Sequence, residues 1–224
     1  DAGERVTFPV EIDLRKGDKL QIVGPNGIGK TTFFNLIGKR GSKGITIKDD
    51  VTVGYYRQDF STLNFDDTVY DSLAEAMRSS GMKLDEEHLR SVAAGFLITG
   101  ELVRTKIGNL SEGQKGLLLF ARLYAQEPDL LILDEPTNHL DLEMRHALTV
   151  ALQEYQGGVV IVSHDRAMLR STCDKFMLVA DGRAEVFDGD LDDYKDWLNQ
   201  QKIADKQKLE LNVTAPVSAN KVDR

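Results

Sequence analysis

The sequence has 224 residues and a formal net charge of −8 at neutral pH. This acidic balance gives no overall positive surface to neutralise a nucleic-acid backbone, so an RNA partner would require a local basic patch or another part of a longer protein. The single cysteine excludes an internal disulfide. The apolar runs LLIL and VVIV are far shorter than the ~20 residues of a membrane-spanning helix.

The first quarter of the chain is predicted to alternate strands with loops. Residues 6–12 alternate apolar and polar side chains, and residues 19–23 form a second predicted strand that runs into the glycine-rich stretch GPNGIGKTT at 24–32. A helix is predicted from Lys30, and a further strand at 51–56 precedes a polar turn around Gln58. The predicted order is therefore a strand, then a glycine-rich loop, then a helix.

The next segment is predicted to be helical. Thr68 and Asp71 form a capping pattern at the start of residues 66–99, whose apolar side chains recur on one face. We expect a small helical subdomain at about 62–110. A second, more apolar helix follows Ser111.

The second half alternates strands and helices again. LLILD at 130–134 and VVIVS at 159–163 are predicted strands, and helices are predicted at about 142–155 and from Asp165. This pattern predicts an α/β fold with a parallel sheet covered by helices and a hairpin at Asp181-Gly182 on one edge.

The C-terminal region is predicted to contain one more helix and a tail. The helix begins near Asp190, and the polar, small residues of 201–224 predict its end and a disordered tail. We therefore expect one domain over residues 1–200 and a tail over 201–224. This tail and the abrupt start of the chain are typical of a piece of a longer polypeptide.

The glycine-rich loop matches the Walker A pattern, Gly24-x-x-x-x-Gly29-Lys30-Thr31. Its backbone N–H groups would cradle phosphates at a helix N-terminus, Lys30 would reach the β- and γ-phosphates, and Thr31 would ligate Mg²⁺. The alternative is a glycine-rich turn that matches by chance. The predicted strand before the loop and helix after it favour the phosphate site.

The apolar strand at 130–134 ends in two carboxylates, Asp134 and Glu135. Alone, these could be a turn cap and a solvated charge. Beside a Walker A loop, Asp134 is expected to hold the Mg²⁺ shell and Glu135 to polarise the attacking water.

LSEGQ at 110–114 is by itself a capping box of Ser111 and Gln114. Placed between the Walker A loop and LLILDEPTNHLD, it resembles the signature of ATP-binding-cassette (ABC) ATPases. The resemblance implies a P-loop NTPase cassette with a small antiparallel β portion, in which Ser111 and Gly113 contact the γ-phosphate of ATP held by a partner cassette. Glu112 stands where the family has glycine, and a carboxylate pointing inward there would weaken that contact.

Two further positions match the family pattern. Gln58 falls in the Q-loop and is implied to contact Mg²⁺, whereas alone it could be a surface glutamine. His164, in VVIVSHDR, falls at the switch histidine, whereas alone it could be a structural or solvated side chain. The resemblance thus implies Glu135, His164 and Lys30 as catalytic residues and Thr31, Gln58 and Asp134 as Mg²⁺ ligands. The implied nucleotide-binding residues are Asn26, Gly27, Gly29, Lys30, Thr31, Thr32, Gln58, Ser111 and Gly113.

The segments EPTNHLD, VSHDRAMLRSTCD and FDGDLDDYKDWL resemble the ABC-F family, and this resemblance covers about residues 5–200. The run MRHALTVALQEYQGGVVIVSHDR and the polar tail resemble the second cassette of its YheS-like branch. This family implies a cytoplasmic, twin-cassette ATPase without a membrane domain, which acts on ribosomes and tRNA in translation. It implies a second cassette as partner, in the same parent chain or as a second copy. The aromatic residue that usually stacks on adenine is unassigned, since Phe8 is a poor substitute, and this predicts weakened nucleotide binding. His88, His139 and His146 have no zinc-ligand spacing, so no zinc is expected.

Two other functions remain open from the sequence. The chain could be the nucleotide-binding subunit of a membrane ABC transporter. It could also be a regulatory cassette that binds ATP and hydrolyses little of it, a reading favoured by Glu112.

Overall fold

The computed structural model describes residues 14–24, 30, 34, 48, 50–180, 183–200 and 203. The chain divides into two compact units, Asp1–Phe187 and Asp188–Arg224. The predicted strand at 6–12 and the tail after 203 lie outside the described residues.

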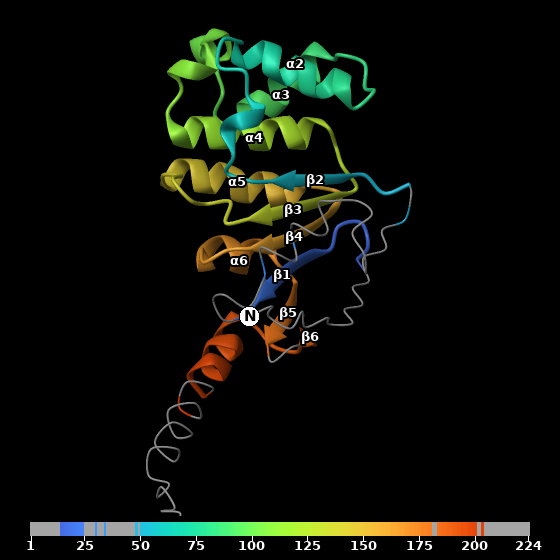
Figure 1. The fold of residues 1–224 in the computed structure, drawn as a ribbon, viewed down its shortest axis with the longest axis vertical. Coiled ribbons are helices and arrows are strands. Elements are labelled where there is room, and N and C mark those ends of the chain that lie inside the picture. Colours follow the sequence, from blue (N-terminus) through green and yellow to red (C-terminus); the bar gives the residue numbers. More distant parts are fainter. Residues whose placement is uncertain are drawn as a thin grey trace, which may run out of the picture. The chain divides into compact units, whose positions relative to one another are not determined.

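The first unit is built on a six-stranded sheet in the order β2-β3-β4-β1-β5-β6 (Figure 1). Its strands are β1 (Lys19–Val23), β2 (Val53–Tyr56), β3 (Leu130–Asp134), β4 (Gly158–Val162), β5 (Lys175–Ala180) and β6 (Arg183–Phe187). The first five pair in parallel, and β6 pairs antiparallel with β5; the predicted turn residues Asp181 and Gly182 lie outside the described residues. The predicted α/β fold is therefore confirmed.

The strands that carry the candidate site are buried on both faces. β1 and β4 are buried along their whole length, which is typical of parallel strands covered by helices on either side. One face of the sheet packs a cluster of apolar side chains around Phe34: Leu20, Ile22, Ile132, Val160, Val162 and Met177. These strands form a rigid base because their backbones are paired and their side chains are packed on both sides.

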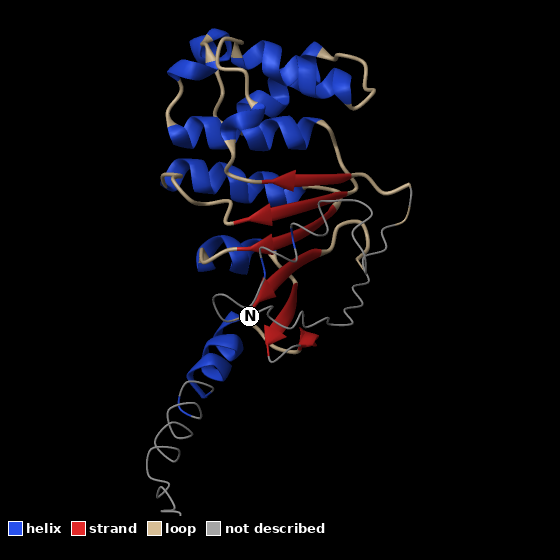
Figure 2. Ribbon diagram, in the orientation of Figure 1, coloured by secondary structure: helices blue, strands red, loops and turns tan. Residues whose placement is uncertain are grey.

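Helix α4 (Glu112–Ala125) precedes β3, whereas α5 (Leu142–Glu154) follows β3 and α6 (Arg166–Thr172) follows β4. Each begins where a side chain caps it. Ser111 and Gln114 form the predicted capping box of α4, Asp141 accepts from the Met144 N–H, and Asp165 accepts from the Met168 N–H. Figure 2 shows these helices alongside the strands.

The expected helical subdomain lies beyond the β2 edge of the sheet, with α4 between them (Figure 1). It contains α2 (Val69–Ser79), α3 (Glu86–Gly95) and three short 3₁₀ helices, η1 (Phe60–Thr62), η2 (Gly100–Arg104) and η3 (Ile107–Asn109). The predicted Thr68 cap of α2 is present, since its side chain accepts from the Asp71 N–H.

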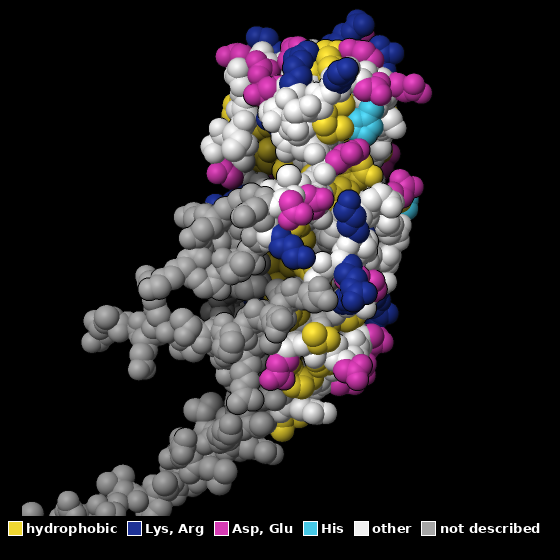
Figure 3. Space-filling model, turned by 90° about the vertical axis from the view of Figure 1, so that its right-hand side faces the viewer, with side chains coloured by type: hydrophobic (Ala, Val, Ile, Leu, Met, Phe, Trp, Pro, Cys, Tyr) yellow, Lys and Arg dark blue, Asp and Glu magenta, His cyan; other side chains and the backbone are white. Residues whose placement is uncertain are grey.

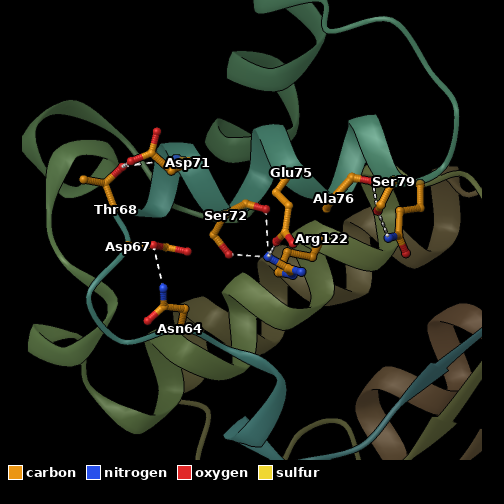
Figure 4. Close-up of polar contacts among 10 residues, drawn as sticks. Asn64, Asp67, Thr68, Asp71, Ser72, Glu75, Ala76, Ser79 and Arg122 are labelled. Atoms are coloured by element: carbon orange, nitrogen blue, oxygen red, sulfur yellow. Dashed lines mark hydrogen bonds and ion pairs between the residues drawn. The ribbon is translucent and has the colours of Figure 1, made fainter.

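Arg122 ties α4 to α2 (Figure 4). Its Nη1 donates to the Ser72 carbonyl at 2.8 Å, to the Ser72 hydroxyl, and to Glu75 Oε2 at 3.1 Å. Aromatic packing joins α4 to the sheet edge, because Phe120 stacks on Tyr56 of β2 with ring centroids 3.9 Å apart. The helix that begins at the signature motif is thus attached at both sides.

The second unit contains a helix over residues 191–200. Asp190 and Asp193 cap its start reciprocally: the Asp193 N–H donates to Asp190 Oδ1, and the Asp190 N–H donates to Asp193 Oδ2.

Across the described residues, no helix is both long and apolar enough to cross a membrane.

Candidate nucleotide-binding site

Lys30 follows the central strand β1 in the chain and lies close to its carboxyl end. Its Nζ donates a hydrogen bond of 2.6 Å to the carbonyl of Gly24, the first residue after β1. Burial lowers the pKa of this ammonium, and the carboxylates of Glu135 and Asp134 oppose that shift. The structure therefore brings Lys30 close to both carboxylates. Five other predicted residues of the loop lie outside the described residues: Asn26, Gly27, Gly29, Thr31 and Thr32.

Asp134 and Glu135 occupy the carboxyl end of β3. Asp134 is opposite Val162 in the parallel pairing with β4, and the Glu135 N–H continues that ladder by donating to the Val162 carbonyl at 2.8 Å. Glu135 then turns the chain with a φ of 48°, a left-handed conformation that is uncommon for a residue with a side chain. The ladder on one side and this turn on the other fix where the carboxylate points.

His164 and Glu135 meet although they follow different strands. Because β3 and β4 are neighbours, their carboxyl ends meet at one edge of the sheet, and His164 Nε2 lies 3.3 Å from Glu135 Oε1. Burial raises the pKa of Glu135, and Asp134 adds to this rise, whereas His164 and Lys30 oppose it. The imidazole is 74% exposed and the carboxylate 25% exposed, so the carboxylate is the better shielded partner.

Gln58 is placed at the same edge by β2. It comes two residues after the end of that strand, which pairs with β3 in the register Tyr56 to Leu133. Its side chain is half-buried. Asp134, Glu135, His164 and Gln58 thus lie at the carboxyl ends of three neighbouring strands, β3, β4 and β2.

Ser111 and Gly113 belong to a different neighbourhood, the N-terminus of α4. Ser111 is exposed and holds the capping box, while Gly113 is buried against the segment between β3 and α5. A Cβ on Gly113 would lie 2.9 Å from the His139 carbonyl and 2.8 Å from Met144 Sδ. Glycine is therefore required here by close approach.

The sequence analysis missed two hydroxyl residues that hold the loops of this edge. Thr137 Oγ1 and Ser163 Oγ are buried and lie 3.5 Å apart, and Ser163 Oγ accepts from the Asp165 N–H at 3.1 Å. These contacts join the loop after β3 to the loop after β4. The signal was weak, because Ser and Thr after a strand are common in any turn.

The chemistry of these groups fits a magnesium nucleotide. Lys30 offers a half-buried ammonium for phosphate oxygens, and Asp134 offers a carboxylate beside it. In the described part of the chain, no three His, Cys, Asp or Glu side chains cluster to hold a metal by themselves. Mg²⁺ at nucleotide sites takes one or two carboxylates and completes its shell with phosphate and water, so one carboxylate here is consistent with that ion.

Comparison with known proteins agrees with this chemistry. The family described as ABC transporter matches residues 8–138. The ATP-binding protein YheS of Escherichia coli (strain K12) is 39% identical over 210 residues, which cover 92% of this chain and 32% of YheS. The chain thus spans about a third of the length of this relative.

Solved structures show the same fold. The ATP-binding subunit of an ABC transporter superposes with a TM-score of 0.68 over 89% of each chain at 24% identity. The archaeal ribosome recycling factor aABCE1, solved in complex with the ribosomal stalk protein aP1, superposes with a TM-score of 0.62 at 29% identity, covering 76% of this chain and 34% of the other.

Proposed function

Because the chain belongs to the ABC family, and its relatives place it with the ABC-F branch, we propose that it is one cassette of a twin-cassette ATPase that acts on ribosomes in translation. The family assignment supports ATP binding and hydrolysis in general. The observation that carries the proposal for this chain is the pairing of Glu135 with His164 beside Lys30.

Each residue of the edge has a distinct task in this proposal. When bound, Mg²⁺ would supply positive charge to offset that of the γ-phosphoryl group of ATP. Lys30 binds phosphate oxygens, Asp134 with Gln58 and Thr31 orients the ion, and Glu135 accepts a hydrogen bond from the attacking water. A raised pKa makes the Glu135 carboxylate a stronger base than an ordinary glutamate. His164 orients that carboxylate from 3.3 Å away.

A second cassette completes the site in this proposal. Ser111 and Gly113 sit at the N-terminus of α4, a separate neighbourhood from the edge that holds Lys30, and would contact ATP bound by the partner. The relative YheS is about three times as long as the matched region, which leaves room for another cassette in such a protein. The partner is either a second cassette of the same parent chain or a second copy.

The ribosome is the finer part of the proposal. It rests on YheS as a relative and on the likeness to an archaeal ribosome recycling factor. On the face shown in Figure 3, Lys and Arg side chains are interspersed with Asp and Glu side chains over the described residues. A face of mixed charge does not by itself bind rRNA or tRNA through phosphate neutralisation, so we propose that this face is not the main RNA contact. Action on ribosomes implies a cytoplasmic location.

The test is Glu135→Gln in the twin-cassette protein, with Glu154→Gln as the matched control on an exposed part of α5. Loss of the base is expected to slow hydrolysis by ~10² to 10⁴ while ATP remains bound, because Lys30 and Asp134 are unchanged. The variant should also accumulate on ribosomes in the ATP-bound form, as measured by co-sedimentation. Hydrolysis at the unmodified rate would refute the role of Glu135.

Two other outcomes would redirect the proposal. Recovery of the protein with membranes after a high-salt wash, and not with ribosomes, would favour a transporter subunit, whose fold it shares. Single-turnover hydrolysis that is near zero with only this site intact would favour a regulatory cassette, for which Glu112 in the signature is the motivating residue.

A further inference from the structure

The first residue of α4, Glu112, makes a contact that its position in the motif does not predict. Its Oε2 lies 3.5 Å from Nδ1 of His139, in the loop between β3 and α5. Both side chains are more than half exposed, at 68% and 57%. The Glu112 carboxylate is solvated, and it also contacts a residue that lies 27 positions later in the chain, 139 minus 112.

The backbone around the pair is held in place on both sides. The capping box fixes the first turn of α4, since Ser111 Oγ accepts from the Gln114 N–H and Gln114 Oε1 accepts from the Ser111 N–H. Gly113 packs directly against the His139 carbonyl. His139 itself has a φ of 61°, so its backbone turns sharply at this contact. Local geometry thus fixes the backbone of both residues that make this contact.

A carboxylate at the first helical position has two opposite effects. It is favourable to the isolated helix, because a negative charge interacts well with the N-terminal end of the helix dipole. It is unfavourable to a second anion at the same helix end, because like charges repel and compete for the same N–H groups. A phosphate that approaches Ser111 and Gly113 is therefore repelled by the Glu112 carboxylate unless that carboxylate is held by another group.

We propose that His139 is a positioning residue that holds the Glu112 carboxylate, so that the N-terminus of α4 accepts the phosphate of ATP bound on the partner cassette. This inference rests on the proposed pairing of cassettes. Contact with the imidazole at 3.5 Å keeps the carboxylate turned away from the approaching phosphate. The contact with His139 thus compensates for the charge of Glu112. A glycine at this position would carry no charge and would need no such contact.

The test is a double-mutant cycle in the twin-cassette protein. His139→Asn removes the imidazole and keeps a residue that tolerates a positive φ, so backbone strain is avoided. Glu112→Gly removes the charge, and Glu112→Gln removes it while keeping a side chain of the same shape. Each variant is measured for kcat and KM of ATP hydrolysis, for ATP-dependent cassette association by cross-linking, and for its thermal midpoint.

His139→Asn is expected to weaken ATP-dependent association by about five-fold, the size of one charge at a helix terminus. The affinity of ATP for the site that contains Lys30 in the same chain should be unchanged. Glu112→Gly or Glu112→Gln should restore association in the His139→Asn background to within about two-fold of the unmodified protein, because the charge that required holding is gone.

Three results would overturn the inference. If His139→Asn behaves like the unmodified protein, the contact is incidental. If Glu112→Gln does not rescue His139→Asn, and both single variants lower the thermal midpoint, the pair only stabilises the fold. If the unmodified protein shows neither ATP-dependent association nor hydrolysis, the proposed function fails and the inference fails with it, which is distinct from failure of rescue alone.

Discussion

A partly buried cation, Arg122, helps to attach the helical subdomain to α4, and substituting it gives the sharpest test of the packing. Arg122 is 18% exposed, and its Nη1 donates to the carbonyl of Ser72, a residue that is 1% exposed, and also to the Ser72 hydroxyl. Glu75, the third partner, is 66% exposed. The contacts therefore divide into a buried part and a solvated part.

The expected cost follows from this division. A hydrogen bond to a charged group contributes about 1.5–3 kcal/mol, and an ion pair with a solvated partner contributes about 0–1 kcal/mol. Arg122→Met keeps much of the apolar stem and removes both, so the free energy of unfolding should fall by about 2–3 kcal/mol. Glu75→Gln removes only the solvated pair and should cost less than about 1 kcal/mol.

Urea denaturation followed by circular dichroism measures these differences, with the thermal midpoint as a second reading. A loss of about 2–3 kcal/mol corresponds to a drop of about 4–12 °C for a chain of this size. Adding Ser72→Ala to Arg122→Met should cost little more, because the unpartnered hydroxyl is removed with its donor. The reasoning is wrong if Arg122→Met lowers the free energy of unfolding by less than about 0.5 kcal/mol. It is also wrong if Glu75→Gln lowers the free energy of unfolding by as much as Arg122→Met does, because the contact with Ser72 would then not be what attaches α2 to α4.

Two further predictions concern buried backbone and thiol groups. Burial raises the pKa of Cys173 to about 12, so the native thiol should react with an alkylating reagent at pH 8 at least ~100-fold more slowly than the unfolded chain, and equal rates would contradict its burial. Because a Cβ on Gly157 would lie 2.6 Å from Tyr155 Cε1 and 2.9 Å from the Asp129 carbonyl, Gly157→Ala should lower the free energy of unfolding by about 1–3 kcal/mol. The control Gly95→Ala, whose added methyl group meets no described atom within 4 Å, should be neutral or stabilising by up to about 1 kcal/mol in the same denaturation assay, and equal losses in the two variants would contradict the steric argument.

The sequence predicted the helices and strands well where one short segment contains the whole signal. The continuous apolar run at β3 and the capping residues Ser111 and Asp165 gave element types and starts that the structure confirms. Local patterns suffice here because a strand buried on both faces and a capped helix are recognised from neighbouring residues alone.

Contacts between distant segments were not predictable in this way. Arg122 reaches Ser72 across 50 positions, and the contact of Glu112 with His139 depends on how α4 packs against the loop after β3. Neither pair has a sequence pattern, because any exposed glutamate or half-buried arginine fits many partners equally well until the helices are packed.

The sequence by itself determined the strand before the glycine-rich stretch and the second apolar strand that ends at Asp134 and Glu135, and it predicted that the glycine-rich stretch holds phosphate. Only the tertiary structure decided that β4 lies between β3 and β1, which brings His164 within 3.3 Å of Glu135 and sets both beside Lys30. Backbone hydrogen bonds are the same for every pair of parallel strands, so strand order is chosen by the packing of side chains and helices over the whole sheet.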